Sequence, residues 1–161
     1  MYPCPDGSPT TVRDVTALRQ TRTLGERLGR RAAPGDVLLL SGTLGSGKTA
    51  LTQGVARGLD CDEVISSPTF TLMKEHLSGR LPLYHFDLYR LDDPEEIWLL
   101  GFEEYFGGPG VCVVEWAERA PDAWTMPHLW LELAVTGAQA RRITGCARGE
   151  RGHILLAQCA R

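Results

Sequence analysis

Apolar and polar positions alternate in blocks that predict strands and helices in turn. Residues 37–40 and 111–114 are uninterrupted apolar runs, as in strands buried on both faces of a sheet. Residues 16–31 and 50–59 instead place apolar side chains at helical spacing. These blocks predict an α/β fold in three layers around a central, mostly parallel sheet that includes some antiparallel strands.

The other elements are predicted from shorter apolar segments and the turn residues between them. Acids around Pro94 indicate the start of a helix that ends near Gly101. The further expected elements are strands at 10–15, 70–76, 83–87, 129–135 and 138–146 and a terminal helix around 153–159. Residues 1–9 are expected to form a loose tail, and the whole chain, 1–161, is expected to be a single domain.

Composition agrees with one globular domain, since 161 residues with 43% hydrophobic content can bury a sizeable core. The net charge of −3 gives no sign of a nucleic-acid-binding surface. The basic pairs Arg30-Arg31 and Arg141-Arg142 are interpreted as solvated faces or strand ends. No signal peptide and no apolar run of membrane-spanning length is apparent, so we expect a cytoplasmic protein without a membrane partner.

Five scattered cysteines, an odd number without a C-x-x-C pair, favour reduced thiols over a disulfide framework or a zinc site. This pattern agrees with the expected cytoplasmic location.

The segment after residues 37–40 carries the clearest chemical signal. Residues 42–49, here called the glycine loop, match the phosphate-binding pattern G-x-x-x-x-G-K-[ST] and lie between a predicted strand and helix. Glycines let backbone N–H groups point at phosphate oxygens, Lys48 adds positive charge, and Thr49 offers a hydroxyl to Mg²⁺. The expected nucleotide contacts are Gly42, Thr43, Leu44, Gly45, Ser46, Gly47, Lys48, Thr49 and Ala50.

Two acids at strand ends are candidates for the metal and for water activation. Asp87 and Glu115 each close an apolar run, and open α/β sheets place their ligand crevice at the carboxyl ends of strands. Desolvating a carboxylate is costly, so a packing role for these acids is hard to justify, and the alternative to a functional role is an exposed carboxylate at a strand end. Which acid holds Mg²⁺ and which orients water is not decided by spacing.

Three further candidate residues, in other segments of the chain, have less specific signals. Thr69, in Ser67-Pro68-Thr69, occupies the position of a loop that senses the γ-phosphate or Mg²⁺ in nucleotide-switch proteins, but the local sequence favours an ordinary turn. His85 is interpreted as a structural histidine. Trp116, directly after Glu115, caps the nucleotide site or merely packs.

Four segments in this order resemble the TsaE (YjeE) family of bacterial P-loop ATPases, over most of the chain from about residue 16. They are residues 44–49, 67–70 (Ser-Pro-Thr-Phe), 85–90 (His-Phe-Asp-Leu-Tyr-Arg) and 114–116 (Val-Glu-Trp). The resemblance implies a P-loop NTPase three-layer sandwich and a cytoplasmic, Mg²⁺-dependent ATPase. It also implies a role in forming threonylcarbamoyladenosine at position 37 of tRNA, together with TsaB and TsaD. ATP hydrolysis, weak in the chain alone, would reset the TsaB–TsaD complex, and tRNA would be contacted only through that complex.

The resemblance also implies roles for individual residues. Lys48 and Thr49 would contact phosphate and Mg²⁺, Asp87 and Glu115 would lie near the metal, Thr69 would belong to a switch-like loop, and Trp116 would lie beside the site. The chain departs from the family at three loop positions. Thr43 stands where the family commonly has an acid, Ser46 where it has alanine, and Ala50 where it has a second threonine. None of these removes a backbone or Lys48 contact, but the acid's role at position 43 is left open.

Three other functions are alternatives to an ATPase. A GTPase is disfavoured, because the chain has no asparagine for an Asn-Lys-x-Asp guanine site and no D-x-x-G switch. A small-molecule kinase would need an arginine-rich lid, for which only Arg90 and Arg119 are candidates. A nucleotide-gated binding module with negligible turnover stays open, because hydrolysis can depend on a partner.

Overall fold

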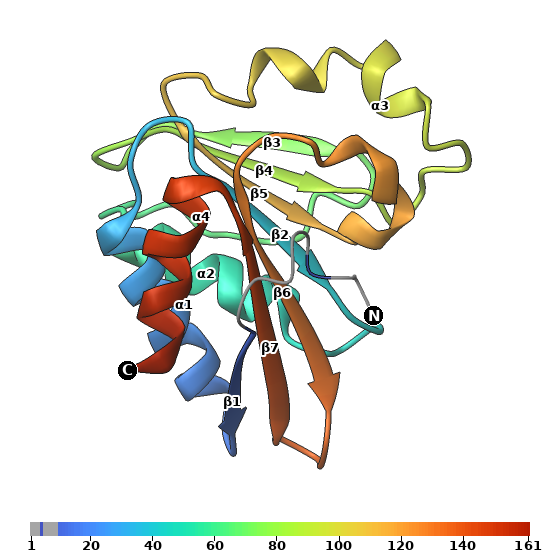
Figure 1. Cartoon of the computed structure of the whole chain (residues 1–161). Helices are drawn as coiled ribbons and strands as arrows, with labels where there is room; N and C mark the ends of the chain where they lie inside the picture. The colour runs from blue at the N-terminus through green and yellow to red at the C-terminus, as the bar shows by residue number, and fades with distance from the viewer. Residues whose placement is uncertain (1–3, 5–9) are drawn as a thin grey trace.

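The computed structural model describes Cys4 and residues 10–161, so the predicted tail at 1–9 lies outside the described residues except for Cys4. Within the described part, seven strands form one sheet in the order β1-β7-β6-β2-β5-β4-β3 (Figure 1). The strands are β1 Thr11–Val15, β2 Val37–Ser41, β3 Met73–His76, β4 Leu83–Asp87, β5 Val111–Glu115, β6 His128–Val135 and β7 Arg141–Arg148. The α-helices are α1 Leu18–Arg31, α2 Lys48–Gly58, α3 Glu96–Leu99 and α4 Gly149–Leu156. The α/β prediction is confirmed.

Only the centre of the sheet is parallel. Strand β2 pairs in parallel with β5 and β6, and β4 pairs in parallel with β5. The β1–β7, β6–β7 and β3–β4 pairs are antiparallel. Of the seven described strands, all but β3 and β7 therefore run in one direction, and the sheet is mixed, with some antiparallel strands as predicted. The β3–β4 and β6–β7 connections are too short for a crossover, so these neighbours must run in opposite directions.

Both faces of the sheet are covered, because successive residues of the central strands point to opposite sides. Leu38 and Leu40 of β2 belong to a core shared with α1, α2 and α4, which lie together on one side of the sheet in Figure 1. Val37 and Leu39 belong to a second, aromatic-rich core. The layer over that second core consists of α3 and 3-10 turns, which are Phe102–Glu104, Ala117–Arg119 and Pro121–Ala123.

Glycines bring α1 and α2 into direct backbone contact. A Cβ atom at Gly54 of α2 would lie 2.1 Å from the carbonyl oxygen of Arg22 in α1. A Cβ atom at Gly25 of α1 would lie 2.2 Å from the carbonyl oxygen of Leu51. Only glycine fits at either position, and this contact fixes the helix that begins at the glycine loop.

Several element boundaries differ from the prediction, among them β7, which was expected at 138–146 and spans Arg141–Arg148. The strand expected from residue 70 begins at Met73, because a turn closed by the Leu72 N–H and the Pro68 carbonyl precedes it. The helix expected from Pro94 is reduced to the four residues of α3, although it ends next to Gly101 as predicted. The terminal helix begins at Gly149, earlier than expected, and continues into a 3-10 turn, Ala157–Ala160.

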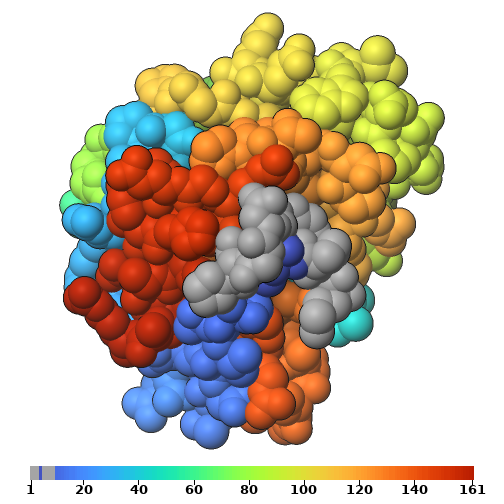
Figure 2. All heavy atoms as spheres, viewed as in Figure 1, coloured from blue at the N-terminus to red at the C-terminus, as the bar shows by residue number. Residues whose placement is uncertain are grey.

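The prediction of reduced thiols is wrong for one pair of cysteines. Cys4 and Cys146 form a disulfide, while Cys61, Cys112 and Cys159 are free. Sequence spacing gives no sign of this pair because the partners are 142 residues apart. The two ends of the described chain also meet, since Arg13 of β1 donates to the carbonyl oxygen of Cys159 at 3.3 Å. Figure 2 shows these N-terminal and C-terminal segments side by side on the surface. No helix in the described part of the chain is both long enough and apolar enough to cross a membrane.

Candidate functional site

The glycine loop connects the end of β2 to the start of α2 and takes a shape that glycine permits. Gly42, Gly45 and Gly47 have φ values of 142°, 78° and 106°. A Cβ atom at Gly42 would lie 2.4 Å from the carbonyl oxygen of Leu133 in β6, whereas one at Gly45 would meet nothing within 4 Å. The first glycine therefore fits against the sheet, and the middle of the loop faces open space.

Lys48 places its ammonium group over the loop. Its Nζ donates to the carbonyl oxygens of Gly42 at 2.5 Å and Thr43 at 3.0 Å and to Ser46 Oγ at 3.3 Å. The same atom lies 4.0 Å from the centre of the Trp116 ring. Burial lowers the pKa of Lys48, and the nearby carboxylates of Glu118, Glu115 and Asp87 oppose that shift. The three hydrogen-bond acceptors are neutral, so the positive charge stays available to an anion at the mouth of the loop.

Glu115 is a buried, hydrogen-bonded carboxylate rather than an exposed strand end. It is 2% exposed, and Thr49 Oγ1 lies 3.0 and 3.1 Å from its two oxygens. His85 Nε2 lies 2.8 Å from Oε1, and Thr52 Oγ1 lies 3.4 Å from the same oxygen. These partners come from α2 and β4, so a helix and a strand together hold the acid.

Asp87 lies beside Glu115 because the two residues are register partners in the parallel pair β4–β5. Ser67 Oγ and Thr69 Oγ1 both donate to Asp87 Oδ2, the latter at 3.3 Å. The Tyr89 N–H donates to Oδ1 at 2.8 Å. The fold therefore brings the Ser-Pro-Thr segment into direct contact with this acid.

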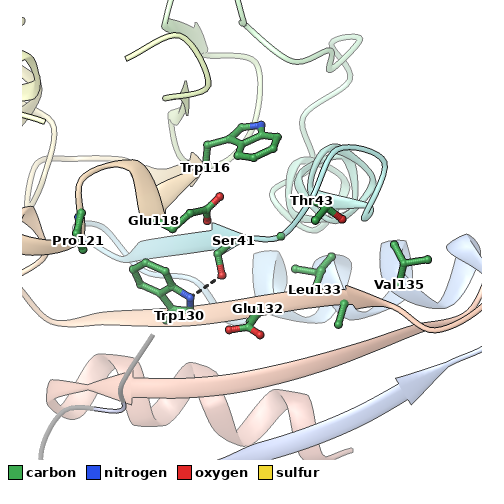
Figure 3. A pocket seen from close by; sticks show the side chains of 11 residues that line it. Ser41, Thr43, Trp116, Glu118, Pro121, Trp130, Glu132, Leu133 and Val135 are labelled. Atoms are coloured by element: carbon green, nitrogen blue, oxygen red, sulfur yellow. Dashed lines mark hydrogen bonds between the residues drawn. The ribbon is translucent and has the colours of Figure 1, made fainter. Parts of the chain in front are cut away.

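A cavity of about 360 Å³ joins these groups. Its lining includes most of the residues predicted from the sequence: Leu44, Gly45, Ser46, Gly47, Lys48, Thr49, Ala50, Thr69, Asp87, Glu115 and Trp116. Gly42 and Thr43 line a neighbouring cavity of about 600 Å³ instead (Figure 3). Trp116 lines both cavities, so its side chain lies between the cavity that contains Asp87 and Glu115 and the larger one.

The larger cavity is lined by two acids that sequence reasoning missed, Glu118 and Glu132. In Figure 3 the Glu118 side chain lies between Trp116 and the end of β2, near Ser41. Burial raises the pKa of Glu118. On the β6 side, Trp130 Nε1 donates to Ser41 Oγ at 2.8 Å, so an aromatic wall closes the cavity there.

Two further residues support the site. His85, interpreted as a structural histidine, is fully buried, and its Nε2 lies 2.8 Å from Glu115 Oε1. Arg141, interpreted as part of a solvated face or a strand end, is the first residue of β7 but is only 6% exposed. Its Nε and Nη2 donate to the carbonyl oxygens of Ser46 at 2.9 Å and Gly45 at 3.0 Å. Its neighbour Arg142 is exposed, as predicted, and pairs with Asp14. Neighbouring residues of a strand point to opposite faces, so the pair Arg141-Arg142 could have been expected to contain one buried and one exposed arginine.

The sequence model of the family described as "Threonylcarbamoyl adenosine biosynthesis protein TsaE" matches residues 15–143. The chain belongs to the TsaE family. A curated TsaE protein of Bacillus subtilis is 42% identical over 142 residues, which cover 88% of this chain and 89% of that protein. The TsaE protein of Treponema pallidum is 40% identical over 126 residues, covering 78% of this chain and 93% of its own length.

The fold also matches that of a solved structure. A crystal structure of Bacillus subtilis YdiB superposes with a TM-score of 0.81 at 36% identity and covers 94% of this chain and 95% of that one. The match to the TsaE family includes the glycine loop, both acids and Arg141, so the site described above lies within the family's shared region. As a member of the TsaE family, this protein belongs to tRNA threonylcarbamoyladenosine biosynthesis.

Proposed function

We propose that this TsaE protein binds ATP with Mg²⁺ and hydrolyses it in support of threonylcarbamoyladenosine formation at position 37 of tRNA. The observation that carries the proposal is the meeting of three groups around one cavity. Lys48 lies at the mouth of the glycine loop, and the Thr49 hydroxyl lies 3.0 Å from a buried carboxylate, Glu115. A cation for phosphate next to oxygen ligands for a metal is the combination that triphosphate hydrolysis needs.

Phosphate binding would fall to the glycine loop and α2. Backbone N–H groups at a helix N-terminus attract anions, and the helix dipole adds to the effect of Lys48. The Lys48 ammonium already has its donors directed at oxygen atoms of the loop, and phosphate oxygens would replace these neutral acceptors. Arg141 supports the loop from behind by holding two of its carbonyl groups.

The donor set fits Mg²⁺, which prefers oxygen ligands and binds through one or two carboxylates plus phosphates. Thr49 and Glu115 would hold the ion, with Asp87 beside them on the neighbouring strand. Bound Mg²⁺ would neutralise charge that develops on the transferred phosphoryl group. Asp87, which Ser67 and Thr69 contact, would orient the attacking water, while His85 would keep Glu115 in place.

Adenine is the proposed base because the guanine-reading Asn-Lys-x-Asp segment requires asparagine, which the chain lacks. A kinase gains no support, since Arg90 stacks on Phe70 at 4.3 Å and Arg119 lies near aromatic rings, so the two do not form a lid. TsaB and TsaD are the proposed partners in a cytoplasmic complex, and the net charge of −3 favours contact with tRNA only through that complex. A nucleotide-gated module without turnover would release no phosphate from ATP even with both partners present.

Substitution of Lys48 tests the site, and the other lysine of the chain provides a matched control. Lys48→Ala should weaken MgATP binding by at least about tenfold, equivalent to about 1.4 kcal/mol, because it removes the cation over the loop. Lys74→Ala alters an exposed residue of β3 and should bind like the wild type. Calorimetry measures both affinities, and phosphate release with and without TsaB–TsaD measures turnover. Wild-type affinity and turnover in Lys48→Ala would remove the site assignment.

A further inference from the structure

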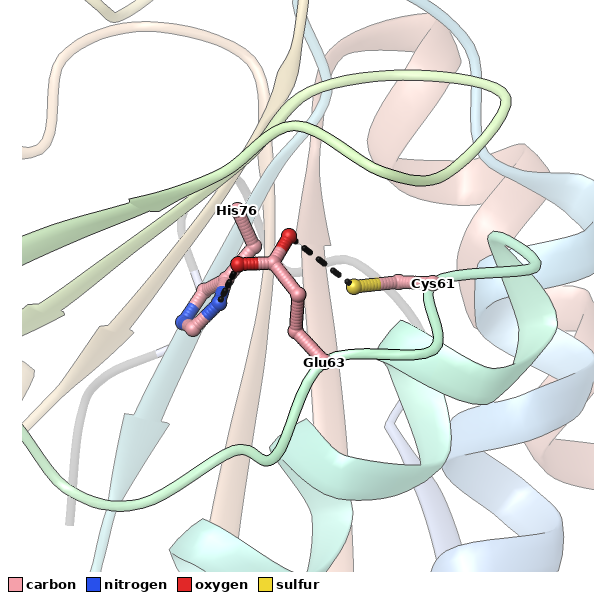
Figure 4. A group of neighbouring side chains, drawn as sticks. All are labelled: Cys61, Glu63 and His76. Atoms are coloured by element: carbon pink, nitrogen blue, oxygen red, sulfur yellow. Dashed lines mark hydrogen bonds and ion pairs between the residues drawn. The ribbon is translucent and has the colours of Figure 1, made fainter.

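A second cluster of reactive side chains lies away from the glycine loop. Cys61 and Glu63 follow the C-terminal end of α2, and His76 is the last residue of β3 (Figure 4). His76 pairs with Leu83 at the start of β4, whereas Asp87 is at the other end of that strand. The cluster is therefore at the N-terminal end of β4, and the candidate nucleotide site is at its C-terminal end.

We propose that Cys61, Glu63 and His76 bind a zinc ion. One ligand atom from each residue lies within 4.8 Å of the other two. Cys61 Sγ is 3.8 Å from Glu63 Oε2, and His76 Nδ1 is 3.3 Å from Glu63 Oε1. Bonds of about 2.0–2.3 Å to a tetrahedral zinc ion separate neighbouring ligand atoms by about 3.3–3.8 Å. The two distances to the Glu63 carboxylate, each to a different oxygen, fall within this range, and a thiol and imidazole no more than 4.8 Å apart need only a small adjustment to share an ion.

The types of ligand atom also select zinc. A thiolate, an imidazole and a carboxylate form a mixed sulfur, nitrogen and oxygen set, which suits zinc better than Mg²⁺ or Ca²⁺. His76 is fully buried and its Nε2 has no hydrogen-bond partner, so Nδ1 is the nitrogen that faces the cluster. Cys61 and Glu63 are partly exposed, which gives an ion a path from solvent and leaves the fourth position to water.

Ser78 holds two of the three ligands in place. Its backbone N–H donates to Glu63 Oε2 at 3.2 Å, and its Oγ donates to Cys61 Sγ at 3.3 Å. Such supporting contacts orient ligands before an ion binds. Cysteine spacing predicts no zinc site, since the chain has no C-x-x-C pair. The fold supplies Glu63 and His76 in place of further cysteines.

A bound ion would add metal bonds between two parts of the chain that otherwise meet through hydrogen bonds, such as that from the Arg80 N–H to the Leu59 carbonyl oxygen at 2.8 Å. The segment carrying Cys61 and Glu63 leads on to Ser67 and Thr69, which contact Asp87. Zinc would attach the beginning of that segment to the β3–β4 hairpin. The proposal does not depend on ATP binding and can fail or succeed separately from it.

The test is a zinc titration of untagged, full-length protein in competition with a chromophoric chelator. The wild type should bind one ion per chain, and Cys61→Ser and Glu63→Gln should each weaken binding at least tenfold. Asp62→Asn, which alters the exposed acid between the two ligands, is the matched control and should leave the affinity unchanged. Glu63→Gln changes a half-exposed side chain and should fold even if a cysteine variant does not.

Two further measurements separate a zinc site from a hydrogen-bonded turn. Zinc should slow alkylation of Cys61 by iodoacetamide at least tenfold, and Co²⁺ should give a thiolate charge-transfer band that Cys61→Ser abolishes. Absence of zinc binding by the wild type would overturn the proposal. Equal zinc affinity in the wild type, Cys61→Ser and Glu63→Gln would also overturn it, because the ion would then be bound elsewhere.

Discussion

The buried acid Glu115 illustrates how single residues define the candidate site. A carboxylate without hydrogen bonds is costly to bury, but Thr49 and His85 both contact this one directly. The acid is thereby held beside the hydroxyl that the phosphate-loop pattern assigns to a metal. Removal of the carboxylate should therefore affect chemistry more than nucleotide binding.

Glu115→Ala should retain ATP affinity within about threefold and lose about 10²–10⁴-fold in turnover, because Mg²⁺ would lose a ligand and with it several kcal/mol of transition-state stabilisation. Phosphate release in the presence of TsaB–TsaD measures the loss, and calorimetry measures the affinity. Glu115→Gln keeps a side chain that can contact Thr49 but removes the charge, so it should be nearly as slow. Full activity of either variant would mean that Glu115 is structural.

Arg141 supports the glycine loop from β7 through hydrogen bonds to the Ser46 and Gly45 carbonyl oxygens. Arg141→Lys should weaken ATP binding by about tenfold, because a point charge cannot replace the planar guanidinium that spans both carbonyls. Arg142→Ala is the control, since its exposed pair with Asp14 should contribute no more than about 1 kcal/mol. Equal affinities in the two variants would contradict a supporting role for Arg141.

At the scale of elements, the contact between α1 and α2 holds the helix on which Thr49 and Thr52 lie. A Cβ atom at Gly54 would lie 2.1 Å from a backbone oxygen of α1, an atom that cannot move without moving the helix. The packing of α1 against α2 therefore fixes the position of the end of the glycine loop and the direction of the Thr49 and Thr52 hydroxyls.

Gly54→Ala should lower the free energy of unfolding. Alanine is better than glycine in a helix by about 1 kcal/mol, but overpacking against a backbone costs about 1–3 kcal/mol and should exceed the gain. Urea denaturation measures the difference. The exposed neighbour Arg57→Ala should stay within about 0.5 kcal/mol of the wild type. A stabilised Gly54→Ala protein would show that the helices are less closely packed than described.

The elements differ in how well the sequence predicts them. Strand β2, the glycine loop and α2 are recognised locally, because apolar runs, glycine positions and helical spacing are properties of short segments. The order of strands in the sheet is set by pairings between distant segments, and the sequence does not predict it. The same limit explains why the contacts of Arg141 and His85 and the Cys4–Cys146 bridge were not anticipated, since each has partners far away in the sequence.

At the scale of the whole molecule, membership of the TsaE family places the protein in threonylcarbamoyladenosine biosynthesis. The central claim is that this role depends on ATP handled by the glycine loop and the two acids. Lys48 lies over the loop, and Arg141 supports the loop from behind. Loss of the Lys48 side chain should therefore disable the site without altering the fold.

Nucleoside analysis of tRNA in cells depleted of this protein tests that claim most directly. The cells would carry a plasmid for the wild type, Lys48→Ala or Lys74→Ala, each at equal abundance. The wild type and Lys74→Ala should restore threonylcarbamoyladenosine, and Lys48→Ala should leave it at the depleted level. Full restoration by Lys48→Ala would contradict the account.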